Sequence, residues 1–388
     1  MYHVKTMNKI SKIGLAELDD RFEISDTMEH EDAILVRSAK LHDYDFPAEL
    51  LCIARAGAGV NNIPLDRAAE AGIVVFNTPG ANANGVKELT IAALLLASRK
   101  ISQGITWVKE QAAAGADVAA VVEKGKAAYV GPEIQGKTLG VVGLGAIGVQ
   151  VANIATKLGM TVFGYDPFLS VDGALSLSRL VHRAMDLETI YKNCDYITLH
   201  VPQTPETKGM FNEDAFHMMK GGVRILNLAR GTLVNDDDML AALDSGKVAC
   251  YVTDFPNGKI LRGKNVVAIP HLGASTPESE QNCAAMAVDE LTDYLENGNI
   301  VNSVNFPNCD MGVCTAAGRI CILHRNIPNS LSRFTTAVAA EGINIAGLMN
   351  KSRGEYAVTM LDLDHKVSSN ACEHLKNIEG VLRVRVIQ

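Results

Sequence analysis

The sequence predicts an α/β protein with two parallel-sheet domains and a smaller C-terminal domain. The chain has 388 residues, which is more than a single hydrophobic core usually supports. Short apolar runs alternate with amphipathic segments in two separate stretches, the pattern of parallel strands with helices on both faces. The final stretch has the order strand, helix, strand, strand, helix, strand, which is typical of a ferredoxin-like βαββαβ unit.

The first alternating stretch precedes residue 84. It contains three expected strands, "DAILVRS", "LLCIARAG" and "GIVVFNT", with the helix "IPLDRAAEAG" between the last two. In residues 83–115, apolar positions recur at helical spacing for about seven turns. We expect one long helix there that crosses between domains.

The second alternating stretch begins at "KTLGVVGLGAIG" and ends at "NVVAIPH". Residues 275–298 then predict an amphipathic helix, with Ser275 or Thr276 as N-cap and Pro277 in its first turn, which returns the chain to the first domain. Residues 299–312 are rich in Asn and Pro and predict a linker. The expected domains are 1–83 with 285–305, 84–284, and 316–388, of which the first two are Rossmann-like or flavodoxin-like.

Composition argues against several classes of protein. No run approaches the roughly 20 apolar residues of a membrane helix, and "MYHVKTMNKISKIG" at the start lacks the apolar core of a secretory signal. The formal net charge is −8 and no long basic block occurs, so we expect no nucleic-acid partner and no membrane partner. The eight cysteines show no CxxC spacing, which favours reduced thiols in a cytoplasmic protein without a metal site.

A glycine motif gives the strongest local signal. Gly143, Gly145 and Gly148 form GxGxxG directly after a β-run and at the start of a helix, and Asp166 ends the next β-run. In such a motif the first glycine permits a tight turn, the second lets a pyrophosphate approach, and the third lets helix and strand pack closely. An acid at this position binds ribose hydroxyls and repels a 2′-phosphate, so the motif predicts NAD binding. The alternative is a glycine-rich turn that serves packing alone.

Three further polar residues end apolar runs in the second stretch. Arg230 follows "ILNLA", Asp254 ends "ACYVTD" and His271 follows "VVAIP". Loops and ligand-binding groups of an α/β sheet gather at such strand ends. Taken alone, each residue leaves a structural role open, and a lone histidine is more often structural than catalytic.

The order of these motifs resembles the D-isomer specific 2-hydroxyacid dehydrogenases. The resemblance spans roughly residues 30 to 300 and includes "RAGAGVNNIPL", "HVPQTPETKGMFN", "NLARGTLVN" and "PHLGAST". It implies a split substrate-binding domain, an NAD-binding domain and a C-terminal ACT regulatory domain. The implied reaction is NAD-dependent oxidation of D-3-phosphoglycerate to 3-phosphohydroxypyruvate, the first step of L-serine biosynthesis. A dehydrogenase of another D-2-hydroxy acid, or a non-catalytic NAD-sensing protein, remains an alternative.

The resemblance also implies roles for single residues. Arg230 would orient the substrate carboxylate and His271 would take the proton from the C2 hydroxyl. Asp254 would bind the nicotinamide amide, and Arg55, Ala56 and Gly57 would bind the phosphorylated 2-hydroxy acid. The other implied cofactor contacts are Gly143, Gly145, Ala146, Ile147, Gly148, Asp166, His200, Val201, Pro202, Thr207, Ala229 and Gly273.

One position departs from the family. A glutamate normally follows the aspartate by about five residues and hydrogen-bonds the histidine, but Lys259 stands at that counted position here. No carboxylate lies between Asp254 and His271 in the sequence. Loss of such an orienting partner often lowers a rate by orders of magnitude. Either the loop aligns differently and Lys259 points away, or a carboxylate from elsewhere replaces the glutamate.

The remaining implications concern regulation and assembly. His324, Asn326 and Asn344 match positions that bind L-serine across a pair of ACT domains, although a pure dimerisation domain is the alternative. Trp107 and Lys109 resemble a Trp-x-Lys spacing that in some members reaches a neighbouring subunit's phosphate pocket. We therefore expect a homodimer or homotetramer, with serine as an effector.

Overall fold

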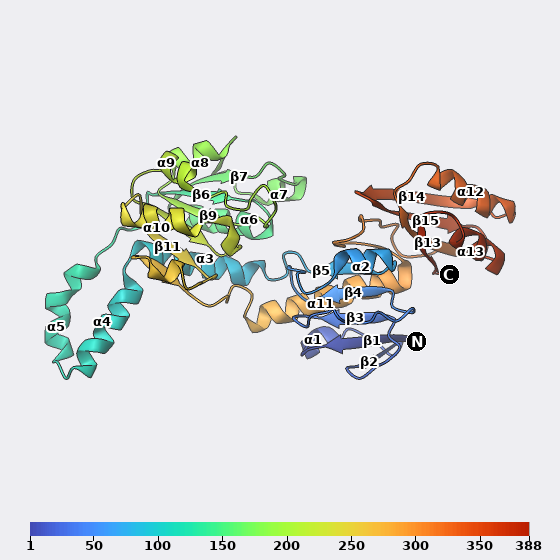
Figure 1. Ribbon diagram of the computed structural model, residues 1–388, viewed down its shortest axis with the longest axis horizontal. Coiled ribbons are helices and arrows are strands. Elements are labelled where there is room, and N and C mark those ends of the chain that lie inside the picture. Colours follow the sequence, from blue (N-terminus) through green and yellow to red (C-terminus); the bar gives the residue numbers. More distant parts are fainter. Residues whose placement is uncertain (388) are drawn as a thin grey trace. The chain divides into compact units, whose positions relative to one another are not determined.

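The computed structural model describes residues 1–387 and forms two compact units (Figure 1). The first unit comprises Met1–Asn82 and Glu280–Gln388, and the second comprises Ala83–Ser279. Each unit is built around its own parallel sheet. The chain passes from the second unit to the first within one helix, α11 (Pro277–Asn297).

A five-stranded sheet of order β2-β1-β3-β4-β5 lies at the centre of the first unit, and all its pairings are parallel. Strands β3, β4 and β5 are short and mostly apolar, as expected for strands covered on both faces. Helix α11 supplies buried side chains to the core on one side of this sheet. The elements are β1 (Tyr2–Met7), α1 (Lys12–Leu15), β2 (Phe22–Ser25), β3 (Ala33–Val36), β4 (Cys52–Arg55), α2 (Leu65–Glu70) and β5 (Val74–Asn77).

The segment predicted to be a linker, 299–312, is instead packed against β5. Phe306 is fully buried, and the amide of Val75 donates to Asn305 Oδ1 at 2.9 Å. Asn305 Nδ2 in turn donates to the carbonyl of Ile73 at 2.9 Å. The asparagines that suggested a flexible segment therefore complete the edge of the parallel sheet, because their amides can replace a neighbouring strand's backbone groups.

The C-terminal segment forms a four-stranded antiparallel sheet of order β14-β15-β13-β16. Helices α12 and α13 pack on one face, and their shared core includes Phe334 and Leu375. This is the βαββαβ arrangement predicted from the sequence. Its elements are β13 (Gly318–Arg325), α12 (Ser330–Ala340), β14 (Ile345–Arg353), β15 (Tyr356–Leu363), α13 (Ser369–Lys376) and β16 (Val381–Val386).

The other face of the antiparallel sheet belongs to the core of the first unit. Leu323 and Met360 lie in the same buried cluster as Tyr294 of α11. Arg385 of β16 is 8% exposed, and its guanidinium donates to the carbonyls of Tyr294 at 2.9 Å and Leu295 at 3.1 Å. These carbonyls lie in the last turn of α11, where they also accept from the amide of Gly298 at 3.0 Å and the hydroxyl of Tyr2 at 2.8 Å, respectively. The C-terminal domain thus caps α11.

A seven-stranded sheet of order β12-β11-β10-β9-β6-β7-β8 lies at the centre of the second unit, and all its pairings are parallel. The order reverses between β6 and β9, which is the Rossmann-type switch point where ligands bind. Its elements are α3 (Ala83–Ser98), α4 (Ile101–Ala113), α5 (Val118–Gly125), η1 (Lys126–Tyr129), β6 (Thr138–Val142), α6 (Ala146–Lys157), β7 (Thr161–Tyr165), α7 (Val171–Ser176), β8 (Val181–Arg183), α8 (Leu187–Asn193), β9 (Tyr196–Leu199), α9 (Glu213–Met218), β10 (Val223–Asn227), η2 (Gly231–Leu233), α10 (Asp236–Asp244), β11 (Val248–Thr253), η3 (Ile260–Arg262) and β12 (Val266–Ala268).

The prediction of one helix over 83–115 is wrong, because the helix breaks between α3 and α4. The Ser98 hydroxyl bonds back to the carbonyl of Leu94 at 2.9 Å, a contact that bends helices. The returning chain at Gly131 passes so close that a Cβ there would lie 2.1 Å from the Ser98 carbonyl oxygen. The helix therefore cannot continue in its original direction.

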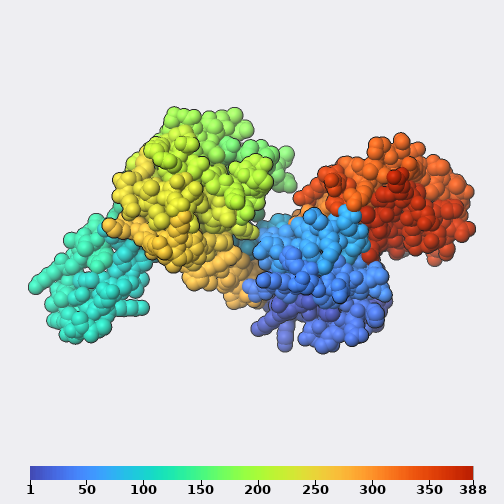
Figure 2. All heavy atoms as spheres, viewed as in Figure 1, coloured from blue at the N-terminus to red at the C-terminus, as the bar shows by residue number. Residues whose placement is uncertain are grey.

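Helices α4 and α5 form an arm that projects from the second unit (Figures 1 and 2). Neither helix contains a buried residue. The tilted rings of Trp107 and Tyr129 pack together with centroids 5.4 Å apart, which joins α4 to η1 within the arm. Ile101 and Ile105 are 43% and 53% exposed on α4. The arm thus presents apolar side chains that nothing in the chain covers.

Three negative observations apply to residues 1–387. No helix in this range is both long and apolar enough to span a membrane. All eight cysteines are free thiols. Over the same range, no cluster of three or more His, Cys, Asp or Glu side chains is arranged to hold a metal ion.

Candidate active site

Six of the seven strands of the second sheet, β12 to β7 in the sheet order, end in register, which brings the predicted residues to one edge. The sheet aligns Tyr165, Val142, Leu199, Asn227, Thr253 and Ala268 as neighbours from β7 to β12. Asp166, Gly143, His200 and Asp254 each follow directly after one of these residues. Arg230 and His271 follow three residues after the ends of β10 and β12. The common edge explains why residues distant in sequence form one site.

The three glycines of the motif have different surroundings. Gly143 has φ +93°, and a Cβ there would lie 2.6 Å from the carbonyl oxygen of His200. At Gly148 a Cβ would lie only 1.9 Å from the carbonyl oxygen of Gly143, so this glycine lets α6 pack against the loop. Gly145 is exposed, and no atom lies within 4 Å of a Cβ built there. Gly145, with Ala146 and Ile147 in the first turn of α6, therefore leaves open backbone at a helix N-terminus, where a phosphate binds well.

Asp166 is attached to the glycine loop. Its Oδ2 accepts from the amide of Leu144 at 2.8 Å, and its Oδ1 accepts from the amide of Phe168 at 2.8 Å. Both carboxyl oxygens keep a second lone pair for a ligand hydroxyl. The carboxylate is thus fixed beside the glycine loop.

His200 and the segment after β9 form one wall of this edge. Burial lowers the pKa of His200 to about 4, and its Nε2 contacts Thr198 Oγ1 at 3.0 Å. The ring is therefore neutral at physiological pH and unsuited to acid catalysis. Thr207 Oγ1 donates to the carbonyl of Pro202 at 2.7 Å and fixes the loop that continues from Val201. These residues follow β9, which lies next to β6 and its glycine loop.

Asn227, at the end of β10, organises the loop that carries Arg230. Its Oδ1 accepts from the amides of Ala229 at 3.2 Å and Arg230 at 3.3 Å, and its Nδ2 donates to the carbonyl of Arg230 at 2.9 Å. Nδ2 also lies 3.3 Å from Tyr251 Oη. Asn227 is completely buried. Asn227 was not among the residues predicted from the sequence, although a polar residue inside the apolar run "ILNLA" is a signal for it.

Asp254 is a buried acid that no side chain hydrogen-bonds. Its exposure is 1%, and within the described residues neither carboxyl oxygen has a side-chain partner. Burial raises its pKa, whereas the charge of His271, the backbone amide of Asp254 itself, the charge of Arg230 and the backbone amide of Gly273 lower it. A Cβ at Gly273 would lie 3.7 Å from Asp254 Oδ2, so the loop after His271 reaches this carboxylate. Asp254, Arg230 and His271 are therefore electrostatic neighbours, and an unsatisfied buried acid at this edge suits a ligand amide.

His271 is exposed, and its ring packs against the ring of Phe255 with centroids 4.6 Å apart. Within residues 1–387 no hydrogen bond or ion pair to the imidazole occurs. Lys259 does not face it. The Lys259 amine instead forms an ion pair with Asp237 of α10 at 2.5 Å. Of the two explanations for the missing glutamate, the structure favours a loop in which Lys259 points elsewhere.

The first unit contributes a second cluster at the carboxyl edge of its own sheet. Ala56 follows β4, and its amide donates to the carbonyl of Val36 at 2.8 Å. Gly57 has φ +146°, and a Cβ there would lie 2.1 Å from Nη1 of Arg55, so the guanidinium lies against this backbone. Arg55 Nε donates to the carbonyl of Arg37 at 3.0 Å. Arg37 was missed in the sequence, although it follows the run "AILV" just as Arg55 follows "CIA".

The predicted effector residues do not meet within one chain. His324 is 2% exposed, with Nδ1 2.9 Å from the carbonyl of Arg325 and Nε2 2.9 Å from Thr359 Oγ1. Its ring has no free nitrogen for a ligand, which corrects the expectation of a direct contact. Asn326 follows β13, whereas Asn344 precedes β14 and lies beside Asp364 at the opposite end of the sheet. Eight residues of strand separate these ends by about 25 Å.

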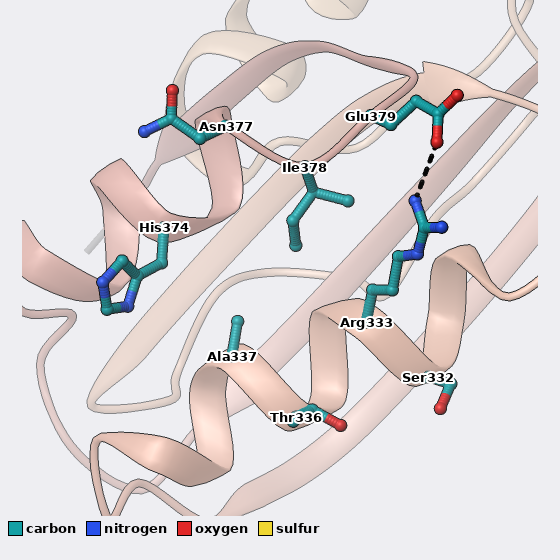
Figure 3. Close-up of a pocket in the computed structure, with 8 residues that line it drawn as sticks. All are labelled: Ser332, Arg333, Thr336, Ala337, His374, Asn377, Ile378 and Glu379. Carbon is teal, nitrogen blue, oxygen red and sulfur yellow. Dashed lines mark hydrogen bonds and ion pairs between the residues drawn. The ribbon is translucent and has the colours of Figure 1, made fainter.

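A pocket of 590 Å³ lies elsewhere on the C-terminal domain, between α12 and α13 (Figure 3). Arg333 and Glu379 form an ion pair across it at 3.2 Å. None of the predicted effector residues lines it. The lining residues are Ser332, Arg333, Thr336, Ala337, His374, Asn377, Ile378 and Glu379.

Comparison with known proteins identifies the family. Residues 91–273 match the family described as "D-isomer specific 2-hydroxyacid dehydrogenase, NAD binding domain". A relative from Haemophilus influenzae is 31% identical over 350 residues, which are 87% of this chain and 82% of that protein. The chain belongs to the D-isomer specific 2-hydroxyacid dehydrogenases. The second unit is therefore the NAD-binding domain of this family, and the open backbone at Gly145 and the unsatisfied Asp254 fit that cofactor.

Other members share the sequence over most of this chain. Relatives from Bacillus subtilis and Homo sapiens are each 35% identical, over 79% and 71% of the chain. All three of these relatives carry the name D-3-phosphoglycerate dehydrogenase. The chain spans 59% of the Bacillus protein's length and 50% of the human protein's length.

Solved structures agree with the fold. The NAD⁺-bound 3-phosphoglycerate dehydrogenase of Entamoeba histolytica is 25% identical, with a TM-score of 0.60 over 78% of this chain and 98% of that one. D-2-hydroxyisocaproate dehydrogenase gives a TM-score of 0.64 at 23% identity and covers 79% of this chain and 100% of its own. The parallel-sheet domains predicted from the sequence are thereby confirmed.

Proposed function

We propose that this chain oxidises D-3-phosphoglycerate to 3-phosphohydroxypyruvate with NAD, the first step of L-serine biosynthesis. The observation that carries this proposal is the meeting of Arg230, Asp254 and His271 at one strand edge beside the glycine loop. The names of the relatives support the choice of substrate. Arg55 at the edge of the first sheet supports a substrate with a second anionic group, whereas the guanidinium of Arg37 forms an ion pair with Glu280 at 2.8 Å.

In this proposal each residue of the site has a separate role. Arg230 binds the carboxylate and polarises the C2 oxygen, because guanidinium matches carboxylate geometry. His271 takes the proton of the C2 hydroxyl on a ring nitrogen. NAD, when bound, accepts the hydride that leaves C2. Arg55, with the backbone of Ala56 and Gly57, binds the distal phosphate, and Asp254 accepts from the carboxamide of the cofactor.

The direct test mixes the purified chain with NAD and D-3-phosphoglycerate at alkaline pH and follows the absorbance of reduced nicotinamide. Turnover of the phosphorylated acid above that of D-lactate and D-glycerate is the expected result. Turnover of an unphosphorylated acid instead would identify a related dehydrogenase. NAD binding without any turnover would identify a cofactor-sensing protein.

The C-terminal domain supports a regulatory proposal. Its βαββαβ order is that of ACT domains, and we assign it this role with L-serine as effector. Because Asn326 and Asn344 lie at opposite ends of the sheet, one serine would contact both only between two copies of the domain. His324 then supports the site from the core. The test measures the dehydrogenase rate and the subunit association with and without added L-serine. If neither changes, the domain serves dimerisation and not regulation by serine.

We also propose a homodimer or homotetramer that acts in the cytoplasm. The uncovered apolar side chains of α4 support contact with a second copy through the arm. Lys109 is exposed on this helix, where a neighbouring subunit could meet it. The eight free thiols suit a reducing compartment. Sedimentation of the chain and of an Ile105→Glu variant would test the assembly, because the variant should dissociate.

A further inference from the structure

The imidazole of His271 is held by an aromatic contact rather than by a hydrogen bond. The ring centroids of His271 and Phe255 lie 4.6 Å apart with an angle of 49° between the planes. His271 is exposed, and within the described chain neither of its ring nitrogens is hydrogen-bonded to a side chain or backbone group. A ring without hydrogen bonds turns easily about its side-chain bonds, because no directional contact fixes it. The face of Phe255 is the contact that limits this rotation.

Phe255 also contacts the segment that carries Arg230. A Cβ built at Gly231 would lie 3.1 Å from the Cβ of Phe255 and 3.7 Å from its Cγ. The absence of a side chain at Gly231 therefore lets Phe255 lie directly against the backbone next to Arg230. The amide of Phe255 donates to Thr253 Oγ1 at 3.1 Å, which fixes its backbone at the end of β11. Phe255 thus joins the segments that carry the two catalytic groups.

We propose that Phe255 is a positioning residue, which sets the distance and orientation of His271 relative to Arg230 through ring contact. This inference rests on the proposed dehydrogenase function and adds a residue to it. The buried carboxylate of Asp254 precedes Phe255 in the chain and supplies a negative charge beside the histidine. The ring contact with Phe255 and the negative charge of Asp254 together then replace the hydrogen bond that would otherwise orient His271. A planar aromatic ring restricts the orientation of the neighbouring imidazole, whereas a flexible aliphatic side chain does not. We therefore expect that position 255 requires an aromatic residue.

The test compares Phe255→Leu, Phe255→Tyr and the parent chain by steady-state kinetics and NAD titration. Phe255→Leu should lower kcat about tenfold, because misplacing a catalytic group costs one to two orders of magnitude. KM for the substrate and the affinity for NAD should stay within about twofold, since Phe255 is not assigned to their binding. Phe255→Tyr retains the ring face and should restore kcat. Gly231→Ala should lower kcat in the same way, because its new methyl group would push Phe255 aside.

A matched control is available in the same domain. Phe163 packs against His182 with ring centroids 5.3 Å apart, within strands β7 and β8 rather than in a loop that follows a strand end. Phe163→Leu should leave kcat unchanged. If Phe163→Leu lowers kcat as much as Phe255→Leu does, the effect is a general loss of packing and the proposal fails. A parent-level kcat in Phe255→Leu would overturn it directly.

Proton NMR keeps the proposal testable even if D-3-phosphoglycerate is not turned over. The ring current of Phe255 should displace the Cε1 proton signal of His271, which is assigned by its absence in His271→Gln. The displacement should disappear in Phe255→Leu and remain in Phe255→Tyr. Lack of turnover with the displacement present would refute the substrate assignment alone. A His271 signal that does not respond to Phe255→Leu would refute the positioning role alone.

Discussion

The glycine motif allows one prediction to be worked in detail, because two of its glycines have opposite surroundings. Gly148→Ala would place a methyl group 1.9 Å from the carbonyl oxygen of Gly143. Contact at that distance requires α6 or the loop to move by more than about 1 Å, and overpacking of this kind typically costs about 3 kcal/mol. Gly145→Ala meets no atom within 4 Å and has φ −72°, which alanine adopts without strain.

The two variants should therefore separate stability from cofactor binding. Gly145→Ala should change the free energy of unfolding by less than about 1 kcal/mol, the usual effect at a helix N-cap. Its methyl group would nevertheless occupy the space through which a pyrophosphate reaches the backbone. The loss of one charge-assisted hydrogen bond would weaken NAD binding by about tenfold to a hundredfold. Gly148→Ala should lose both stability and NAD binding.

The assay is calorimetric titration with NAD together with thermal unfolding of both variants. If Gly145→Ala binds NAD as tightly as the parent chain does, the pyrophosphate of the cofactor does not approach the backbone at Gly145. An unchanged unfolding temperature in Gly148→Ala would show that the close packing of α6 is not required. Either result would refute the division of roles within the motif.

Three further predictions concern single charged residues. Asp166→Asn removes the charge that repels a 2′-phosphate and should raise NADP affinity relative to NAD about tenfold or more, measured by titration with both. Burial raises the pKa of Glu290 to about 8, above its ordinary value of 4.5, so the stability of the parent chain should fall as the pH rises between these values. Glu290→Gln should abolish this fall, so at alkaline pH the variant should be more stable than the parent chain by up to about 4 kcal/mol. Urea unfolding at several pH values measures this, and a difference in stability between variant and parent that does not change with pH would contradict it. Lys259→Glu should leave kcat within about twofold, because Lys259 pairs with Asp237, and a rise in kcat would show that it faces the imidazole.

Much of the candidate site could be predicted from the sequence because strand ends are local features. Arg230, Asp254 and His271 each come at or just after the end of an apolar run, and parallel strands bring their carboxyl ends to one edge. The glycine motif required only its own strand and helix as context. Periodicity and strand boundaries were therefore sufficient for the parallel sheets and for most residues along the edge of the second.

The remainder depends on contacts between distant segments. The end of α3 is set by Gly131, which passes against Ser98 from the other side of the arm. The burial of His324 follows from its position under Phe334 of α12, whose ring centroid lies 4.9 Å from that of the imidazole. The Asn227 side chain hydrogen-bonds backbone groups in the loop that carries Arg230. The path of such a loop cannot be predicted from the periodicity of the sequence. Such features need the three-dimensional arrangement, because neither residue type nor spacing encodes them.

The capping of α11 by Arg385 has a consequence for how the C-terminal domain could be removed. A chain shortened before Gly318 would remove the Arg385 guanidinium from the carbonyls of Tyr294 and Leu295 and would open the apolar cluster around Met360 to water. Such a truncation would therefore destabilise the part of the first unit that remains. The antiparallel sheet cannot be removed as an independent module, because it shares one buried core with α11.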